Sequence, residues 1–396
     1  MSDSLPVLVV GAGPVGLAAA AGLLRHGVPV TVLETEKALP DEMRASTFHA
    51  PTLDLLDELG AAAPLIAQGL AAPHLQYRNR TGDIIAEFDF GLLADVTRHP
   101  YRLQCEQWRL TRILYELLQD RPGFALHFGA AVTGCVDHGD YAEVLLESGE
   151  RIRGAYVVGA DGARSAVRQA AGIGFEGFTW PERFLVLSTP FDFTELIPGL
   201  APVSYFADPE EWFFLLRIPG LWRAMFPVPP EVPDEATLTD TYARARLGRI
   251  VPGRGGYPIS HRTLYRVHQR VAETFRRGRV LLAGDAAHIN NPLGGMGLNG
   301  GVHDACNLAL KLAMVWHGKA PEALLDRYDR QRRGVTVEHV QRQTIANKQG
   351  LEARDPATQQ AFQNRLAEAA SDPVSAHAWL LGASMINSLR QAEEIQ

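Results

Sequence analysis

Residues 5–34 carry the sequence LPVLVVGAGPVGLAAAAGLLRHGVPVTVLE, which decides the fold class of this chain. The first six residues are a short apolar run, as expected of a buried parallel strand. An Ala- and Leu-rich segment without internal proline follows to about His26, and Gly27 stands where helices commonly end. Residues 28–33 are a second apolar run. The stretch therefore predicts a strand–helix–strand unit, the start of an α/β domain of Rossmann type.

The turn between this first strand and the helix has the pattern GxGxxG. The first glycine permits a tight turn, the second lets the backbone approach a pyrophosphate, and the third allows close helix–strand packing. Backbone N–H groups and the helix dipole favour phosphate at this turn, and an acid at the end of the second strand can accept hydrogen bonds from ribose. The pattern predicts a bound dinucleotide without distinguishing FAD from NAD. The expected contacts are Gly11, Gly13, Pro14, Val15, Gly16 and Glu34.

Composition limits the other possibilities. The chain has 396 residues, of which 46% are hydrophobic, enough for a large core and more than one lobe. A net charge of −7 without a long Lys/Arg run argues against a nucleic-acid partner. The three cysteines are widely spaced and suit a reducing compartment, and the thirteen histidines lack metal-ligand spacing, so no metal is expected. No run is apolar for long enough to span a membrane. We expect a cytoplasmic protein without stable membrane association.

A second motif lies in residues 156–168, YVVGADGARSAVR. It places Asp161 and Gly162 directly after an apolar strand. Arg164 and Arg168 follow, where we expect them to form ion pairs on an exposed helix.

A third motif lies in residues 279–301, RVLLAGDAAHINNPLGGMGLNGG. It places Gly284 and Asp285 at the end of a strand, before a glycine-rich loop and a helix expected from about Gly301. In this order and spacing, the three motifs resemble the fingerprints of the flavoprotein aromatic hydroxylases, the family typified by para-hydroxybenzoate hydroxylase. The run 265–288 is most similar to the phenol 2-monooxygenase and hydroxyphenylpropionate hydroxylase branch.

The resemblance implies an α/β fold with a Rossmann-type FAD-binding domain, an inserted β-sheet substrate domain and a C-terminal helical region. Short alternating segments and aromatic-rich stretches in the sequence agree with an inserted sheet. The expected divisions are 1–72, 101–175 and 270–330 for the FAD-binding domain, 73–100 and 176–269 for the substrate-binding sheet, and 331–396 for the C-terminal helices.

The resemblance also implies FAD contacts residue by residue. Asp285 is expected to hydrogen-bond the ribityl chain. The loop 292–299, with the start of the next helix, is expected to hold the pyrimidine edge of the flavin, where backbone donors favour the negative charge of the reduced ring. The further expected contacts are Thr35, Arg44, Gln107, Asp161, Gly162, Pro292, Gly295, Gly297, Leu298 and Asn299.

The activity that the resemblance implies is that of an FAD-dependent monooxygenase. In this family NADH or NADPH reduces the flavin, O₂ adds at its C4a atom, and the resulting hydroperoxide transfers one oxygen to a small phenolic or amino-aromatic ring. A flavin-dependent halogenase or a reductase is the alternative on the same fold. We expect a monomer or a homodimer.

Candidates for substrate contact come from the inserted sheet. Alternation across residues 212–217 places Trp212, Phe214 and Leu216 on one face and Phe213, Leu215 and Arg217 on the other. An aromatic face suits a planar ring, and an arginine suits a carboxylate. The candidates for catalysis are His49, Tyr205 and Arg217, and the sequence does not identify the general base.

Overall fold

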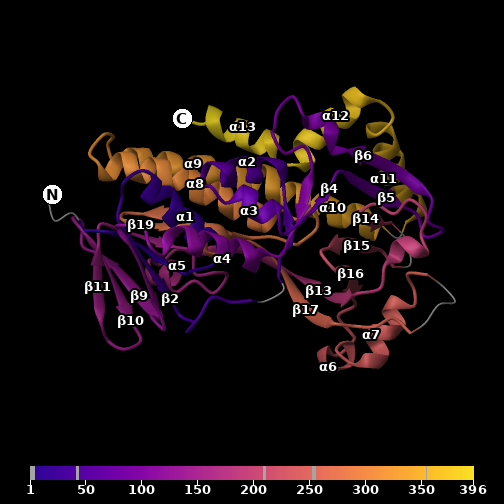
Figure 1. Ribbon diagram of the computed structural model, residues 1–396, viewed down its shortest axis with the longest axis horizontal. Coiled ribbons are helices and arrows are strands. Elements are labelled where there is room, and N and C mark those ends of the chain that lie inside the picture. Colours follow the sequence, from indigo (N-terminus) through magenta and orange to yellow (C-terminus); the bar gives the residue numbers. More distant parts are fainter. Residues whose placement is uncertain (1–4, 42–43, 208–210, 252–255, 354) are drawn as a thin grey trace.

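The computed structural model describes residues 5–41, 44–207, 211–251, 256–353 and 355–396. Figure 1 shows two lobes side by side: a nucleotide lobe on the left, and a sheet lobe on the right with C-terminal helices above it. Each lobe collects strands from distant parts of the sequence, so neither lobe is one continuous stretch of chain.

The nucleotide lobe is built on a mostly parallel sheet, as residues 5–34 predict. β1 (Val7–Val10) pairs in parallel with β2 (Val30–Glu34) on one side and with β12 (Tyr156–Gly159) on the other. All four residues of β1 are buried, which explains why this strand is apolar throughout. The other strands described in this sheet are β8 (Phe124–Phe128) beyond β2, and β19 (Val280–Leu282) and β18 (Arg276–Arg277) beyond β12.

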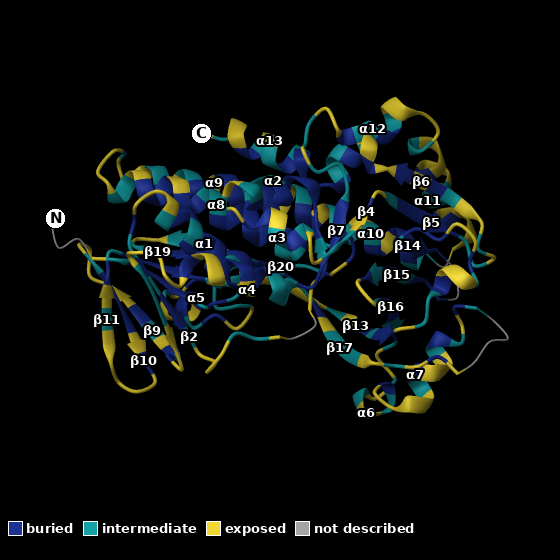
Figure 2. Cartoon of the chain, viewed as in Figure 1, coloured by how far each residue is buried: buried dark blue, intermediate teal, exposed yellow. Residues whose placement is uncertain are grey.

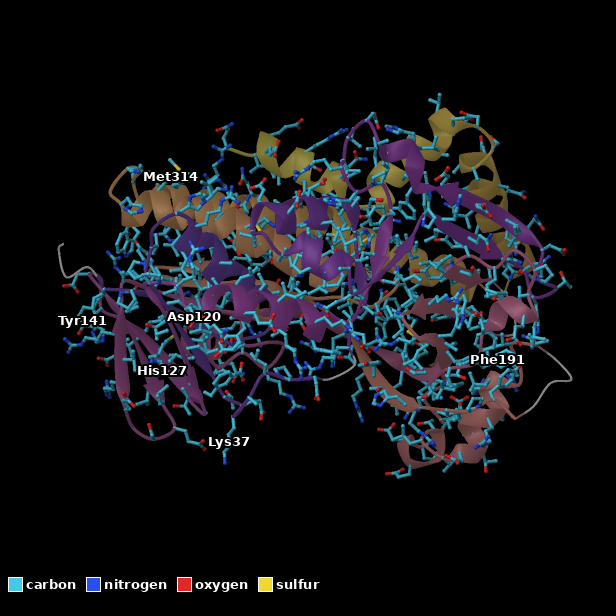
Figure 3. The ribbon with its side chains drawn as sticks, viewed as in Figure 1. Lys37, Asp120, His127, Tyr141, Phe191 and Met314 are labelled. Atoms are coloured by element: carbon cyan, nitrogen blue, oxygen red, sulfur yellow. The ribbon has the colours of Figure 1, made fainter. Side chains whose placement is uncertain are left out.

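Two helices of this lobe pack closely against each other. A Cβ on Gly22 of α1 (Pro14–Arg25) would lie only 2.7 Å from the Cβ of Ala309 on α8 (Met296–Trp316). The outer side of α8 reaches solvent at Met314, which Figure 3 labels. The apolar face of α8 is formed by the buried residues Val302, Ala305, Ala309 and Leu312. The lobe also contains α2 (Ala50–Glu58), α3 (Ala62–Ile66), α4 (Gln107–Leu118), α5 (Ala166–Ala170) and α9 (Ala323–Val335).

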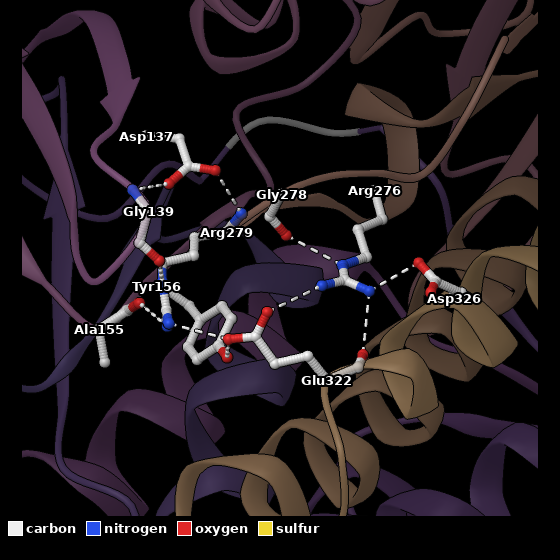
Figure 4. Close-up of polar contacts among 9 residues, drawn as sticks. All are labelled: Asp137, Gly139, Ala155, Tyr156, Arg276, Gly278, Arg279, Glu322 and Asp326. Atoms are coloured by element: carbon white, nitrogen blue, oxygen red, sulfur yellow. Dashed lines mark hydrogen bonds and ion pairs between the residues drawn. The ribbon is translucent and has the colours of Figure 1, made fainter.

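A small antiparallel sheet is attached to this lobe through a polar network (Figure 4). The sheet consists of β9 (Val132–Asp137), β10 (Ala142–Leu146) and β11 (Arg151–Gly154). The backbone N–H of Arg279 donates to Asp137 at 3.0 Å, and the Arg279 guanidinium donates to Glu322 at 2.8 Å. The Tyr156 hydroxyl donates to the same Glu322 carboxylate at 2.9 Å, and Arg276 donates to the Glu322 backbone carbonyl at 2.9 Å. The network therefore joins this small sheet, the parallel sheet and the segment before α9.

The sheet lobe contains a larger, mostly antiparallel sheet. Its two long strands, β13 and β17, pair along most of their length and reach toward the nucleotide lobe (Figure 1). In order across the sheet, the described strands are β20 (His288–Ile289), β17 (His261–Ala272), β13 (Phe175–Thr189), β16 (Leu221–Val228), β15 (Phe213–Ile218), β14 (Val203–Phe206), β5 (His74–Arg78) and β6 (Ile84–Asp89). Since β20 lies within the third motif, just before its glycine-rich loop, this sheet is directly connected to that loop.

Both faces of the large sheet are covered. The predicted alternation across residues 212–217 is confirmed, because Trp212, Phe214 and Leu216 belong to one hydrophobic cluster and Phe213 and Leu215 to another. The first cluster extends into the C-terminal helices, and the second into α7 (Asp240–Leu247). The C-terminal helices are α10 (Arg342–Glu352), α11 (Pro356–Ala369), α12 (Pro373–Ala383) and α13 (Ile386–Glu394), and a π-helical turn, Thr336–Gln341, precedes them.

A short antiparallel sheet, made of β3 (Thr47–Phe48), β7 (Arg102–Gln104) and β4 (Leu70–Ala72), lies near the centre of the molecule where the lobes meet. Figure 2 shows buried residues running through both lobes and this junction. In the part of the chain that the structure describes, no helix combines the length and apolarity needed to cross a membrane.

Candidate active site

Each glycine of the GxGxxG turn is required for a different reason. Gly11 has a φ of +102°, and a Cβ there would lie 2.5 Å from the carbonyl oxygen of Ala160. A Cβ on Gly16 would lie 2.0 Å from the carbonyl oxygen of Gly11. By contrast, a Cβ on Gly13 would meet nothing within 4 Å. The first and third glycines are therefore needed by the fold itself, whereas Gly13 borders open space just before Pro14 starts α1.

Glu34 holds this turn in shape. Its carboxylate accepts hydrogen bonds from the backbone N–H of Ala12 at 2.7 Å and of Glu36 at 2.9 Å. An ionised carboxylate has about four acceptor positions, so capacity for ribose hydroxyls is left. Thr35 is exposed beside it. Glu34 and Thr35 thus lie at the end of β2 beside the glycine turn, which is where a contact with ribose requires them. The ribose contact itself remains a prediction.

The third motif is held directly against the first. A Cβ on Gly284 would lie 3.0 Å from a Val15 methyl carbon, and a Cβ on Gly301 would lie 2.5 Å from it. Asp285 follows in a 3₁₀ turn and is exposed, and its carboxylate accepts no hydrogen bond from any described residue. Desolvation by the surrounding protein raises the pKa of the Asp285 carboxyl, and the charges of His288 and Arg44 oppose that shift. A carboxylate that the protein leaves unbonded in this position fits the hydroxyls of a ribityl chain.

Behind Asp285 lies a buried charge network that the sequence analysis missed. Asp304 accepts hydrogen bonds from the Gly284 N–H at 3.1 Å and from the Arg332 Nε at 2.7 Å, and its other contact is the His288 Nε2 at 2.8 Å. Burial raises the pKa of Asp304, but the charges and hydrogen bonds of His288 and Arg332 outweigh it and hold the pKa below its usual value. The signal was an acidic residue between Val302 and Ala305, on the apolar face of a predicted helix. Because Asp304 fixes the Gly284 N–H, it positions the turn that carries Asp285.

His303, next to this network, makes the stability of the protein depend on pH. It is buried with its Nε2 2.9 Å from the Thr52 hydroxyl. Burial, followed by the charge of Arg332, lowers the pKa of His303 from 6.5 to about 3, so the folded protein keeps it neutral. The unfolded chain takes up the proton first as pH falls below 6.5, and stability is lost from there down to about pH 3.

We therefore expect the FAD-saturated protein to lose about 2 kcal/mol through His303 alone between about pH 7.5 and about pH 5. Urea unfolding of the wild type and of His303→Gln at both pH values measures this contribution. The variant keeps a partner for Thr52 but cannot titrate, so its loss of stability should be smaller by that amount. Equal losses in the two proteins would contradict the assignment.

The loop 292–299 forms a tight turn, and α8 begins earlier than predicted. The Gly295 N–H donates to the Pro292 carbonyl at 2.9 Å, and Gly294 and Gly295 have φ values of +99° and +70°. The expectation of a helix start near Gly301 is wrong: left-handed Gly295 ends the turn, and α8 starts at Met296. Gly300 and Gly301 lie within the helix, where His288 and Val15 leave little room for a Cβ. Gly297, Leu298 and Asn299 therefore belong to the first turn of α8.

No side chain caps this helix N-terminus. The first N–H groups of a helix lack partners within the helix, and they carry its positive partial charge. In a helix of 21 residues, such an end favours an anionic or electron-rich group.

Side chains from both lobes contact this loop. The His49 Nε2 lies 2.8 Å from the Gly294 carbonyl oxygen, and the Tyr205 hydroxyl accepts a hydrogen bond from the Gly294 N–H at 3.2 Å. Asn299 accepts a hydrogen bond from the His49 backbone N–H at 2.8 Å. Burial, and then the charge of Arg102, lower the pKa of His49 well below its usual value. A neutral His49 thus supports the loop, and its action as a base stays a prediction.

The structure brings the predicted contacts Arg44 and Gln107 close together. The Gln107 N–H, at the start of α4, donates to the Ala45 carbonyl at 2.9 Å. The Arg44 carbonyl accepts a hydrogen bond from Arg223 at 2.8 Å, and the charge of Arg44 acts on Asp285. These contacts place both residues beside the third motif.

The second motif links to the third through an arginine. Asp161 accepts hydrogen bonds from the hydroxyl of Ser165 at 2.5 Å and from a backbone N–H at the start of α5, and burial raises its pKa. Gly162 has a φ of +78° and borders open space. The prediction that Arg168 forms ion pairs on an exposed helix is wrong. Arg168 is buried, because α5 packs inward, and it donates to the Ala286 carbonyl at 2.9 Å.

A narrow cavity lies where the loop 292–299 meets the sheet lobe. Its space outside the atoms is ≈ 260 Å³, part of it open to solvent, and little of that space is wide enough for a water molecule. Tyr77 and Tyr205 stack in its wall with ring centroids 5.2 Å apart, and Trp379 of α12 lies edge-on to Tyr77. The sequence analysis missed both Trp379 and the neighbouring Arg102. Among its lining residues are Leu75, Tyr77, Arg102, Tyr205, Met296 and Trp379.

Arg217 does not reach this cavity. It lies on the opposite face of the large sheet, where it donates to Asp192 at 2.9 Å and lies over the ring of Trp222 at 5.6 Å. The suggestion that Arg217 meets a substrate carboxylate is therefore corrected. Tyr205 does line the cavity, and the arginine beside it is Arg102.

These residues fit FAD. Gly13 leaves room where a pyrophosphate would approach, Asp285 offers an unbonded carboxylate, and α8 presents uncapped N–H groups where the flavin edge would lie. The three features lie along one path from β2 to the aromatic cavity. Among the described residues, no group of three or more His, Cys, Asp or Glu side chains is arranged to hold a metal ion.

Fold and site together define a flavin-dependent monooxygenase of the aromatic hydroxylase type. The chain belongs to the family described as "FAD binding domain", whose model matches residues 4–343. It is 35% identical to para-nitrophenol 4-monooxygenase of Pseudomonas sp. (strain WBC-3), over 98% of this chain and 97% of that protein. It is 34% identical to 6-hydroxy-3-succinoylpyridine 3-monooxygenase of Pseudomonas putida, over 90% of this chain and 91% of that protein.

A solved structure agrees with these relatives. The crystal structure of p-nitrophenol 4-monooxygenase from Pseudomonas putida DLL-E4 superposes with a TM-score of 0.91 at 34% identity, covering 98% of both chains. The prediction of an FAD-dependent aromatic monooxygenase is confirmed, and these relatives do not support the alternative of a halogenase or a reductase.

Proposed function

We propose that this enzyme uses NADH or NADPH and O₂ to hydroxylate a small, single-ring phenol. The observation that carries the proposal is the aromatic cavity beside the loop 292–299, because the stacked Tyr77 and Tyr205 form part of its wall and it adjoins the place where the flavin edge would fit. The full-length similarity to a p-nitrophenol monooxygenase supports a substrate of that size. Bound FAD would supply the electron transfer and the oxygen activation.

Different residues of the chain would bind the cofactor and the substrate. The glycine turn, Glu34, Asp285 and the start of α8 would bind the cofactor, and Arg44 and Gln107 would contact it where the lobes meet. The stacked tyrosines would orient the planar ring, since offset aromatic contacts fix its plane. Trp379 and the other apolar walls would keep water away from the reacting atoms. In this proposal the nucleotide lobe holds FAD, and the sheet lobe with the C-terminal helices holds the substrate.

Turnover with labelled oxygen tests this proposal. The purified holoprotein is mixed with NADH or NADPH and with a panel of phenols, amino-aromatic acids and hydroxypyridines, under isotopically labelled O₂. We expect a phenol to stimulate oxidation of the nicotinamide and to yield a product that carries one labelled oxygen atom. Chloride-dependent product without the label would instead favour a halogenase, and no stimulation by any aromatic compound would contradict the proposal.

We also propose that the enzyme works in the cytoplasm as a monomer or a homodimer. Three free thiols, Cys105, Cys135 and Cys306, support a reducing compartment. Sedimentation of the holoprotein at several concentrations measures the oligomeric state.

A further inference from the structure

Arg102 is a buried cation with few partners. It lies on β7, where alternation turns Arg102 and Gln104 to one side and Leu103 to the hydrophobic core of the nucleotide lobe. Its side chain is buried and its partners are uncharged: one guanidinium nitrogen donates to the Ala383 carbonyl at 3.3 Å, the guanidinium lies 5.2 Å from the centre of the Phe90 ring, and the Tyr205 hydroxyl hydrogen-bonds to it. Its Nε has no partner among the described residues. The neighbouring Gln104 Nε2 likewise has no partner there.

Other buried arginines of this protein are compensated differently. Arg223 pairs with Glu106 at 3.1 Å, and Arg332 pairs with Asp304 at 2.7 Å. No carboxylate of a described residue lies within ion-pair distance of Arg102. A buried charge without a counter-ion is unfavourable, so an unpaired arginine at a cavity wall indicates a place for an anion.

The surroundings of Arg102 are suited to an oxyanion. Burial lowers the pKa of its guanidinium, and the phenols of Tyr205 and Tyr77 oppose the shift. The titratable groups that interact with it are these two tyrosines and His49, whose pKa its charge helps to lower. Burial also raises the pKa of Tyr77 far above its usual value, so that tyrosine stays a neutral neighbour. None of these groups supplies a negative charge at neutral pH.

We propose that Arg102 binds the ionised hydroxyl of the substrate, so that the enzyme takes its phenol as the phenolate. This inference rests on the proposed function and assigns the residue that would hold the ionised hydroxyl of the substrate. A phenol that arrives neutral would lose its O–H proton to solvent on binding. The phenolate oxygen would then accept a hydrogen bond from an N–H group of the Arg102 guanidinium. The phenolate ring is richer in electrons than the neutral ring, which favours its attack on an electrophilic oxygen.

The wild-type holoenzyme provides the first test. Its probes are p-nitrophenol, whose phenolate absorbs visible light, and p-nitroanisole, the methyl ether with the same ring and nitro group but no ionisable hydroxyl. Difference spectra over a pH series report both binding and the ionisation state of the bound phenol. We expect p-nitrophenol to bind about 10- to 100-fold more tightly than the ether, and to be ionised when bound at about one pH unit below its free pKa. Because both probes carry the nitro group, a preference for p-nitrophenol cannot come from that group. Equal affinities, or a bound phenol that stays neutral, would overturn the proposal.

Variants assign the effect to Arg102. Arg102→Met should remove the preference for p-nitrophenol over the ether. Arg102→Lys should keep part of that preference, because lysine retains the positive charge but not the planar guanidinium with its paired N–H donors. The control is Arg217→Met, which removes an arginine from the face of the large sheet that points away from the cavity and should change neither affinity. Flavin content and thermal unfolding confirm that each variant is folded. An Arg102→Met holoenzyme that still binds ionised p-nitrophenol as tightly as the wild type would overturn the assignment.

The two proposals fail in distinguishable ways. If the wild type inserts labelled oxygen into phenols but shows no preference for the phenolate, the role of Arg102 is wrong and the proposed function stands. If no phenol perturbs the flavin spectrum or stimulates turnover, both proposals are overturned.

Discussion

Replacing Asp304 with asparagine is expected to lower the free energy of unfolding by about 3–5 kcal/mol. The substitution keeps the size of the side chain but removes its charge, and it leaves the buried Arg332 guanidinium without a counter-ion. Because Asp304 also accepts the hydrogen bond of the Gly284 N–H, the turn that carries Asp285 should loosen. We therefore expect lower flavin content as well as lower stability.

Urea unfolding of the FAD-saturated protein measures the loss, and fluorescence titration with FAD measures the affinity. Asp326→Asn is the matched control, since Asp326 pairs with Arg276 at 2.6 Å but is 54% exposed. An exposed pair of this kind contributes about 0–1 kcal/mol, so the control should differ little from the wild type. A similar small loss for Asp304→Asn would show that the buried network does not stabilise the fold.

A double variant separates charge from hydrogen bonding. Adding Arg332→Met to Asp304→Asn removes the orphaned cation, and much of the lost stability should return. Flavin affinity should stay low, because the contact from Asp304 to the Asp285 turn is still altered. If stability does not return, the loss in the single variant comes from something other than the unpaired charge.

Local signals in the sequence predicted the parts of the fold that depend on neighbouring residues. Apolar residues recur with helical spacing from Gln107 to Leu118, which predicts a helix over that range, and α4 has those same ends in the structure. The alternation of residues 212–217 was also correct, since each face of that strand meets a different hydrophobic cluster. The glycine turn between β1 and α1 was predicted for a similar reason, because Gly16 is required by a backbone contact within the turn itself.

The errors arose where contacts between distant segments decide the structure. The start of α8 was placed too late, because a run of glycines favours a loop unless close packing against Val15 and His288 requires glycine in a helix. Arg168 resembles a solvent-exposed residue until α5 packs inward and its guanidinium reaches the Ala286 carbonyl.

The substrate cavity was the hardest part to predict. Arg102 lies in a strand of three residues, too short to show a period, and its one carbonyl partner is 281 residues away in the sequence. Trp379 belongs to a helix whose apolar residues surround it on most sides, so no face of that helix stands out. Only the folded chain brings these two side chains to Tyr77 and Tyr205.

The second large effect is expected at Gly13. Gly13→Val should yield protein that is folded but nearly free of flavin, with FAD affinity reduced roughly 10- to 100-fold. The backbone at this position is extended, with φ −69° and ψ 176°, so valine adopts it without strain. A Cβ there meets no protein atom within 4 Å, and its methyl groups would fill the space that a pyrophosphate needs.

Two further glycines make the result specific. Gly134→Val, in β9, also places its Cβ where nothing lies within 4 Å, but far from the glycine turn, and should stay folded and fully flavinated. Gly16→Val would bring its Cβ 2.0 Å from the Gly11 carbonyl oxygen, so it should unfold the apoprotein rather than only exclude FAD. Thermal unfolding of the apoproteins, together with FAD titration, separates these three outcomes. If Gly13→Val binds FAD like the wild type, the pyrophosphate does not lie at this turn, and the cofactor must enter the cleft in another way.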